Sequence, residues 1–106
     1  MFERNVREVL NLYNPANPLE KAFTIPAPWY FDKRIEKLER NSVFAANWQV
    51  VGRLDQVAEC GQFFTIDLND EPLVIVRSDD GHLRAFYNVC RHHAAAVVPD
   101  KSGCAK

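Results

Sequence analysis

Residues 62–89 read QFFTIDLNDEPLVIVRSDDGHLRAFYNV, and this stretch decides the fold class. It contains three short runs that are rich in β-branched and aromatic residues, at 62–68, 72–78 and 82–89. Such runs predict β-strands. In the first run apolar and polar residues alternate, which predicts a strand with one buried and one solvated face. A fourth run of the same kind, WQVVGRL, precedes them at 48–54.

Tight turns are expected between the last three runs. The sequence Asp79-Asp80-Gly81 separates two of them, and a glycine at this point can adopt positive φ. Residues 69–72, NDEP, have the composition of a second turn. Strands that follow one another at short intervals with such turns are typical of a small antiparallel barrel or sandwich. We therefore predict a mainly β fold for residues 48–106.

Residues 1–47 have a different pattern, which we interpret as a helical and extended N-terminal extension. Apolar residues at spacings of three and four predict a short amphipathic helix at 2–13. The segment TIPAPWYFD, at 24–32, is expected to be extended because a residue before proline is disfavoured in the α region.

A second helix is predicted over residues 33–46. Asp32 is placed to cap its first turn, because an aspartate side chain can accept a hydrogen bond from a free N–H group there. Its buried side is expected to consist of Ile35, Leu38 and Phe44.

Composition and charge exclude several classes of function. The chain has 106 residues and a formal net charge of −1, which offers no electrostatic attraction to nucleic acid or to a membrane surface. No stretch approaches the ~20 apolar residues of a membrane helix. The first residues, MFERNVREVL, lack the apolar run of a signal peptide, so we expect a cytoplasmic protein. The three cysteines, an odd number, are consistent with a reducing compartment.

The strongest candidate site lies in NVCRHHA, residues 88–94. In an extended segment the side chains of Cys90 and His92 would point the same way. A thiolate and an imidazole are good ligands for zinc or for an iron–sulfur cluster. By itself a C-x-H pair is not specific, because buried free cysteines and hydrogen-bonded histidines are common.

The surrounding sequence resembles the large subunits of Rieske non-haem iron oxygenases, especially choline monooxygenase-like members and related ring-hydroxylating dioxygenases. NVCRHHA is similar to the first half of a Rieske [2Fe–2S] motif, in which C-x-H is followed further along the chain by C-x-x-H. Other similar stretches, in the order of that family, are TIPAPWYFD, VFAANW, WQVVGRLDQV, CGQFFTIDL and EPLVIVRSDDG. The resemblance covers residues 24–106.

The resemblance implies that residues 48–106 form an incomplete Rieske domain and that Cys90 and His92 are cluster ligands. Cys90 would hold the buried iron and His92 the outer iron. His93, where the family often has arginine, is interpreted as a neighbour of the cluster and not a ligand. Cys104 is followed by Ala-Lys rather than by x-x-His, so we interpret it as a bystander. The chain is then expected to be an N-terminal fragment that ends inside the Rieske motif.

For the intact protein, the resemblance implies a monooxygenase or dioxygenase in which the cluster passes electrons to a mononuclear iron that activates O₂. The iron would lie in a catalytic domain outside these residues, so no catalytic residue is assigned and the chain alone is expected to be inactive. The implied partners are a ferredoxin or flavin reductase and further copies of the subunit, with a trimer expected. Choline or another quaternary ammonium compound is the expected substrate, and an aromatic compound is the alternative.

Two other interpretations remain open from the residues alone. Cys90, His92, His93 and Cys104 supply four nitrogen or sulfur donors, the number that a zinc site needs. Alternatively, the chain is a metal-free β module that serves in assembly. An exposed sheet edge in such a module would favour self-association.

Overall fold

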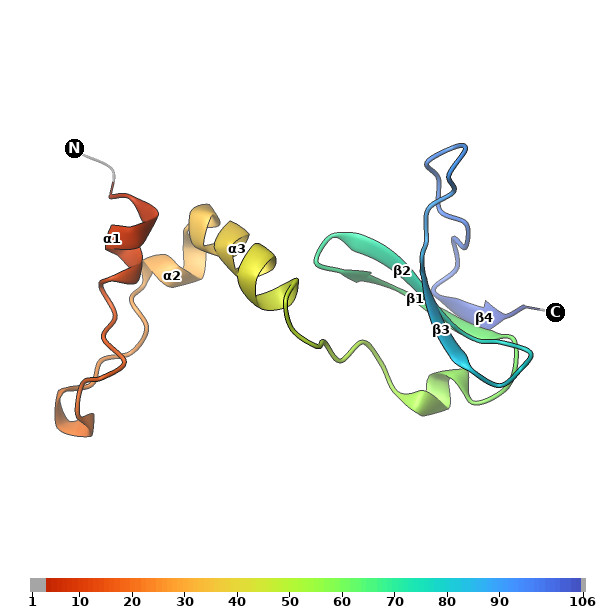
Figure 1. The fold of residues 1–106 in the computed structure, drawn as a ribbon, viewed down its shortest axis with the longest axis horizontal. Helices are drawn as coiled ribbons and strands as arrows, with labels where there is room; N and C mark the ends of the chain where they lie inside the picture. Colours follow the sequence, from red (N-terminus) through yellow and green to blue (C-terminus); the bar gives the residue numbers. More distant parts are fainter. Residues whose placement is uncertain (1–3, 106) are drawn as a thin grey trace. The chain divides into compact units, whose positions relative to one another are not determined.

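The computed structural model describes residues 4–105. The chain divides into two units, Met1–Trp48 and Gln49–Lys106, and each is described by itself. The first unit contains short helices, and the second contains a sheet (Figure 1). Within residues 4–105 no helix is both long enough and apolar enough to cross a membrane.

Helix α1 (Val6–Leu10) is shorter than the helix predicted at 2–13. It begins with a capping box, in which the Asn5 side chain accepts from the Glu8 N–H and Glu8 accepts from the Asn5 N–H. After Leu10 the hydrogen bonds have the tighter i→i+3 spacing, so the α-helix stops there. Residues 2 and 3 of the predicted helix lie outside the described residues.

The prediction of an extended segment at 24–32 is wrong for its second half, which forms helix α2 (Pro28–Phe31). Proline is tolerated in the first turn of a helix, where its missing N–H group has no partner to lose. Trp29 then fixes the turn: its indole nitrogen donates to the Val9 carbonyl over 3.0 Å, and its ring meets Tyr13 edge-on at 5.6 Å. A 3₁₀ turn, η1 (Leu19–Lys21), precedes this helix.

Helix α3 (Lys33–Glu39) begins at Asp32, and the predicted cap is confirmed. The carboxylate accepts from the Arg34 backbone N–H over 2.9 Å and from the Arg34 guanidinium, and these bonds lower the Asp32 pKa to about 2. The helix continues into a π turn, η2 (Arg40–Phe44). Ile35 is buried as predicted. Leu38 and Phe44 are exposed, so the predicted buried side is only partly correct.

The second unit contains one antiparallel sheet with the strand order β3-β2-β1-β4 (Figure 1). The strands are β1 (Gln62–Leu68), β2 (Glu71–Arg77), β3 (Leu83–Tyr87) and β4 (Ser102–Cys104). The mainly β fold class is therefore confirmed. The three runs within 62–89 are strands, each within two residues of its predicted bounds.

The core lies on one face of β1 and β2. Phe64 pairs with Ile75 in the antiparallel register, and Ile66 pairs with Leu73, so these apolar side chains share a face. Val57, in the 3₁₀ helix η3 (Leu54–Val57), packs onto the same cluster. The register places Asn69 and Asp70 in the β1–β2 turn, where both have positive φ.

The run at 48–54 is not a strand, which corrects the prediction. Its backbone has no partner strand within the described residues. The Arg53 N–H group instead binds the side chain of Gln56 over 2.7 Å. Gly52 passes so close to the core that a Cβ atom there would lie 2.6 Å from Phe64 Cζ. The segment therefore covers the core without joining the sheet.

The predicted turn at 79–81 is confirmed by Gly81, whose φ is 80°. Asp80 accepts two hydrogen bonds from the Arg84 guanidinium, both 2.7 Å long, and one from the His82 N–H. Arg77 donates to the Gly81 carbonyl in this turn and to the Val57 carbonyl in η3. The turn is thus tied to both flanking strands and to the segment that covers the core.

Candidate metal centre

The candidate ligands lie in residues 88–98, a loop that leaves the sheet after β3 and runs back toward β4 (Figure 1). Two backbone hydrogen bonds close its outer part. The Cys90 N–H donates to the Ala95 carbonyl over 2.7 Å, and the Ala94 N–H donates to the Cys90 carbonyl over 3.0 Å. Ala94 has φ 52°, in the left-handed region that alanine rarely adopts. This conformation reverses the chain after the two histidines.

Cys90 is half-buried. Hydrogen bonding from the backbone N–H groups of His92 and His93 lowers the pKa of the thiol, against the opposing effect of burial. N–H donors favour the charged thiolate, and thiolate is the form of cysteine that binds metals. The loop therefore favours the form of Cys90 that a metal site would need.

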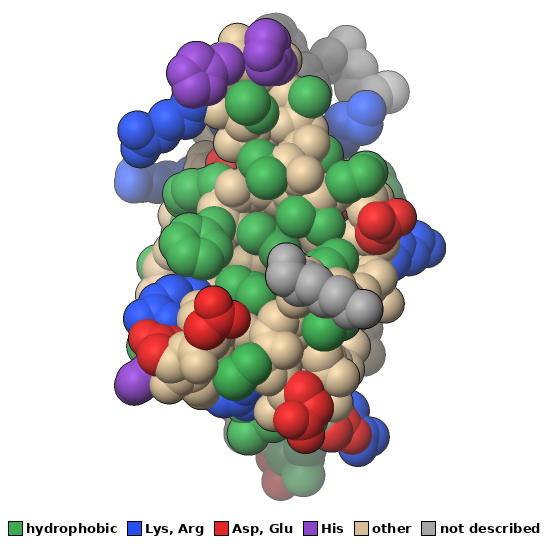
Figure 2. Space-filling model, turned by 90° about the vertical axis from the view of Figure 1, so that its right-hand side faces the viewer, with side chains coloured by type: hydrophobic (Ala, Val, Ile, Leu, Met, Phe, Trp, Pro, Cys, Tyr) green, Lys and Arg blue, Asp and Glu red, His purple; other side chains and the backbone are tan. Residues whose placement is uncertain are grey.

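His92 and His93 are exposed, and their ring centroids lie 6.4 Å apart with an interplanar angle of 50°. In Figure 2, two histidine side chains lie together at the upper edge of the visible face. Residues 91–93 form a turn and not an extended segment. The expectation that the side chains of Cys90 and His92 point the same way, as in an extended segment, therefore does not apply. Their assignment as a ligand pair stays a prediction.

Cys104 belongs to a different part of the unit. It lies in β4, opposite Gln62 of β1, and its sulfur is 4.0 Å from the Cys60 carbonyl oxygen. Among residues 4–105, no three histidine, cysteine, aspartate or glutamate side chains are grouped so that they could hold one ion. The four-donor zinc site of Cys90, His92, His93 and Cys104 is therefore not formed by residues 4–105 as the structure describes them.

The donor chemistry of the loop fits one half of a Rieske cluster. Cys90 offers a sulfur that is stabilised as thiolate, and His92 offers an exposed imidazole. A cluster of this type has two cysteine and two histidine ligands. One further thiolate and one further imidazole are needed in addition to this pair.

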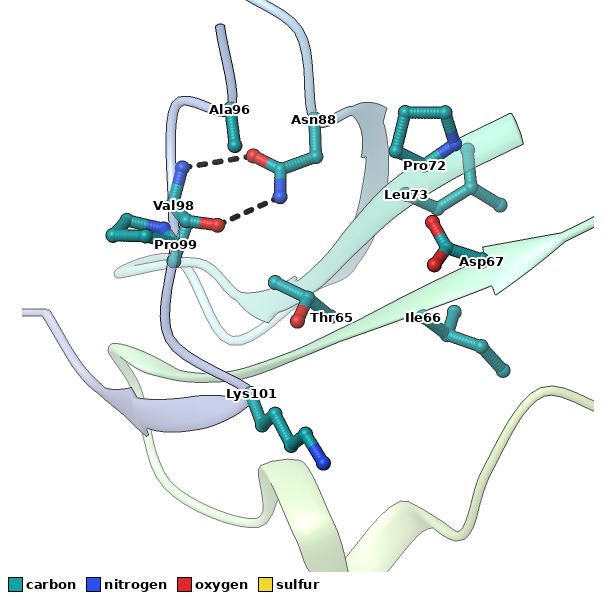
Figure 3. A pocket seen from close by; sticks show the side chains of 10 residues that line it. All are labelled: Thr65, Ile66, Asp67, Pro72, Leu73, Asn88, Ala96, Val98, Pro99 and Lys101. Atoms are coloured by element: carbon teal, nitrogen blue, oxygen red, sulfur yellow. Dashed lines mark hydrogen bonds between the residues drawn. The ribbon is translucent and has the colours of Figure 1, made fainter. Parts of the chain in front are cut away.

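A cavity of about 340 Å³ lies beside the base of the loop (Figure 3). One wall comes from β1 and the start of β2, and the other comes from residues 96–101. Asn88 lies at its edge, with its side-chain amide facing Val98. Asn88 was not predicted from sequence, because an asparagine after a strand carries no signal of its partner ten residues later.

Comparison with known proteins gives matches within one family. Residues 47–106 match the family model for the Rieske [2Fe-2S] domain. Choline monooxygenase of Arabidopsis thaliana is 40% identical over 94 residues, which are 89% of this chain and 22% of that protein. The chain thus spans about a fifth of the length of this relative.

Two solved structures are also similar. The quaternary ammonium Rieske monooxygenase CntA, in complex with its substrate L-carnitine, has 34% identity and a TM-score of 0.75, covering 80% of this chain and 24% of that one. Naphthalene 1,2-dioxygenase has 31% identity and a TM-score of 0.61, covering 66% of this chain and 16% of that one. The sheet, the loop with Cys90 and His92, and these similarities lead to one conclusion: the chain belongs to the Rieske [2Fe-2S] domain family.

Proposed function

We propose that Cys90 and His92 supply one thiolate and one imidazole to a Rieske [2Fe–2S] cluster in the electron-entry domain of an oxygenase. The observation that carries this proposal is the closed turn between Cys90 and Ala95, which keeps Cys90 half-buried and leaves His92 exposed. When bound, a cluster with two histidine ligands accepts one electron at a potential of about −150 to +300 mV.

The two residues have different surroundings, which suit different roles. Cys90 is half-buried, so it would hold the inner iron, and its N–H partners would stabilise the negative charge on sulfur. His92 is exposed, so it would hold the outer iron at the surface, where an electron can pass to or from another group. His93 would remain a neighbour that contributes its backbone N–H and not its ring.

For the whole oxygenase we infer that the substrate is choline or a related quaternary ammonium compound. The named function of the Arabidopsis relative and the substrate bound to CntA support this inference. Electrons would come from a ferredoxin or flavin reductase and reach a mononuclear iron in a catalytic domain, and subunits would form a trimer. We propose hydroxylation for that whole protein and expect none from these 106 residues alone. The cytoplasmic location stays a prediction.

A ring-hydroxylating dioxygenase is the second candidate. The similarity to naphthalene 1,2-dioxygenase supports it, since the TM-score of 0.61 and the 31% identity concern the same kind of domain. The two candidates share the cluster and differ in the reaction and the substrate, both of which depend on the catalytic domain outside these residues.

The test joins residues 1–106 to the remainder of Arabidopsis choline monooxygenase, starting where the matched segment of that protein ends. After dithionite reduction, we expect this chimera to give a rhombic EPR signal of Rieske type, with two sulfides per subunit and two irons in addition to the mononuclear iron of the catalytic domain. Cys90→Ala and His92→Ala should abolish the signal. Cys104→Ala is the matched control, because this thiol lies in β4 and should be dispensable.

The proposal fails if the folded chimera contains no iron and sulfide, or if the signal survives Cys90→Ala. Intact Arabidopsis choline monooxygenase, prepared in the same way, shows that the assembly procedure works. Hydroxylation of choline by the chimera tests only electron delivery to the Arabidopsis catalytic domain. The substrate classes are compared in the whole protein that contains these residues, by incubation with choline, L-carnitine and naphthalene in separate reactions, with the hydroxylated product as the readout.

A further inference from the structure

We propose that Asn88 is a positioning residue that closes the 88–98 loop and thereby holds the Cys90–Ala95 turn, which carries the candidate ligands. The connection to a cluster rests on the proposed function, but the closure of the loop does not. Asn88 is only 6% exposed, and it is the buried polar side chain among residues 4–105. It is not a candidate ligand.

Asn88 binds both polar groups of a single residue across the base of the loop. Its Nδ2 donates to the Val98 carbonyl over 2.7 Å, and the Val98 N–H donates to its Oδ1 over 2.8 Å (Figure 3). This is the exchange of bonds that two opposite strand residues make in an antiparallel ladder, with a side-chain amide in place of one backbone. The Asn88 backbone N–H separately donates to the Pro72 carbonyl over 2.7 Å, which fixes the residue on β2.

The loop has little else to hold it. Within residues 88–98 only Asn88 is buried, and only Cys90 and Val98 are half-buried. Apolar burial therefore cannot define the shape of this segment, and hydrogen bonds must do so. The pair made by Asn88 lies at the base, and the pair between Cys90 and Ala95 lies further out. If the base opens, the outer part loses the fixed ends that keep its turn closed.

The chemistry of the pair requires an amide. Asn88→Ala would leave the N–H and the carbonyl of Val98 without their side-chain partner in a half-buried place. Asn88→Asp would keep the acceptor for the Val98 N–H but lose the donor to its carbonyl. Asn88→Ala thus removes both hydrogen bonds to Val98, and Asn88→Asp removes only the one to its carbonyl.

Hydrogen exchange of the 106-residue chain, followed by NMR, tests the closure. The informative amides are those of Cys90 and Ala94, because neither one binds the Asn88 side chain. We expect Asn88→Ala to accelerate their exchange about tenfold or more, on the scale of a lost pair of hydrogen bonds. Asn88→Asp should have a smaller effect in the same direction. Amides of the β1–β2 ladder should keep their exchange rates.

Thr65→Val is the matched control. The Thr65 hydroxyl donates to the Asp100 carbonyl over 3.0 Å on the wall of the same cavity, but outside the loop. Its removal should leave the Cys90 and Ala94 amides unchanged. The closure is refuted if Asn88→Ala changes these amides by less than twofold, or if Thr65→Val accelerates them equally. It is also refuted if either Asn88 variant accelerates the β1–β2 amides as much as the loop amides.

The chimera provides the readout that distinguishes positioning from general stability. In it, Asn88→Ala should lower the cluster content and shift the reduction potential and the g values of the remaining clusters, while Thr65→Val should alter neither. An unchanged cluster in Asn88→Ala would refute the positioning role, although the proposed function would stand. If the chimera with Asn88 forms no cluster, the proposed function fails, and the exchange experiment still decides whether Asn88 closes the loop.

Discussion

The sheet and the 88–98 loop are neighbouring parts of one unit, but they are stabilised in different ways. In the sheet, Phe64 and Ile75 are buried and pack against Val57, so removal of apolar surface from water defines the structure. In the loop the buried group is a polar amide, and the other contacts are hydrogen bonds. Core packing tolerates little change in volume, whereas the loop depends on the direction of a few bonds.

This difference is compatible with a candidate site at the surface. A loop without an apolar core can expose His92 while it keeps Cys90 half-buried. The rigid sheet provides the two fixed ends, Asn88 at the end of β3 and Lys101 before β4, whose carbonyl binds the Thr65 N–H over 2.9 Å. Changes in the sheet should therefore affect global stability, and changes in the loop should affect local order.

Phe64→Ala should have the largest effect. Removal of a buried phenyl ring costs about 3–5 kcal/mol, a large part of the ~5–15 kcal/mol that stabilises a domain. Urea unfolding followed by far-UV circular dichroism measures the loss. Tryptophan fluorescence would not report on it, because Trp29 and Trp48 both lie in the first unit. Phe86→Ala is the control, since this ring is 53% exposed, and an equal loss there would contradict the assigned core.

Gly52→Ala should destabilise the same core by overpacking. The new Cβ atom would lie 2.6 Å from Phe64 Cζ and 2.7 Å from Gln56 Oε1, so a buried ring would have to move. Such strain costs about 1–3 kcal/mol, which urea unfolding can detect. Gly81→Ala provides the comparison: its Cβ would meet no atom within 4 Å, but its φ of 80° costs about 1–2 kcal/mol. An unchanged urea midpoint in Gly52→Ala would show that the backbone at Gly52 does not pack tightly against Phe64.

The sheet was predictable from sequence because its signals are local. Alternation in β1 and turn residues at 69–72 and 79–81 lie within the segments that they define. The run at 48–54 has the same composition, but a strand needs a partner, and composition does not report one. Likewise α2 depends on the hydrogen bond from Trp29 to Val9, twenty residues earlier.

The site was predictable only in part. The motif identified Cys90 and His92 as candidates, and the resemblance to the Rieske family is confirmed by the match to residues 47–106. Cys104 was interpreted as a bystander because Ala-Lys follows it, but its place in β4, opposite Gln62, could not be predicted from its distance along the chain. The N–H groups that face Cys90 and the amide of Asn88 that closes the loop depend on backbone conformation.

Ala94→Gly should sharpen the contrast by stabilising the loop alone. Ala94 has φ 52°, which glycine adopts without the steric cost of a Cβ atom. The gain is about 0.5–1 kcal/mol, because the unfolded chain with glycine also has more entropy. We expect exchange of the Cys90 and Ala94 amides to slow by a few fold, with unchanged exchange in β1 and β2. Ala95→Gly, at a residue without positive φ, should not slow the exchange of these amides. If both variants slowed it, the positive φ of Ala94 would not be the cause.

Acid should affect the β2–β3 turn and leave the loop unchanged. The guanidinium of Arg84, with help from the His82 N–H, holds the pKa of Asp80 below its usual range. A lowered folded-state pKa means that the ionised carboxylate stabilises the turn above the unfolded-state value of about 4. This stabilisation is lost as the pH falls below that value. The pair is exposed, so salt should weaken the effect.

Amide exchange between pH 5 and pH 3, corrected for intrinsic rates, measures this loss. The Gly81 amide, which donates to the Ser78 carbonyl over 2.8 Å, should lose protection in the native chain and respond less in Asp80→Asn. Asp79→Asn removes the same charge from the same turn but leaves the partner of Arg84, so it should retain the native response. Residues 88–98 contain no carboxylate. If the Cys90 and Ala94 amides nevertheless lost protection together with the Gly81 amide, the loop and the turn would unfold as one unit. The loop would then not be stabilised independently of the sheet.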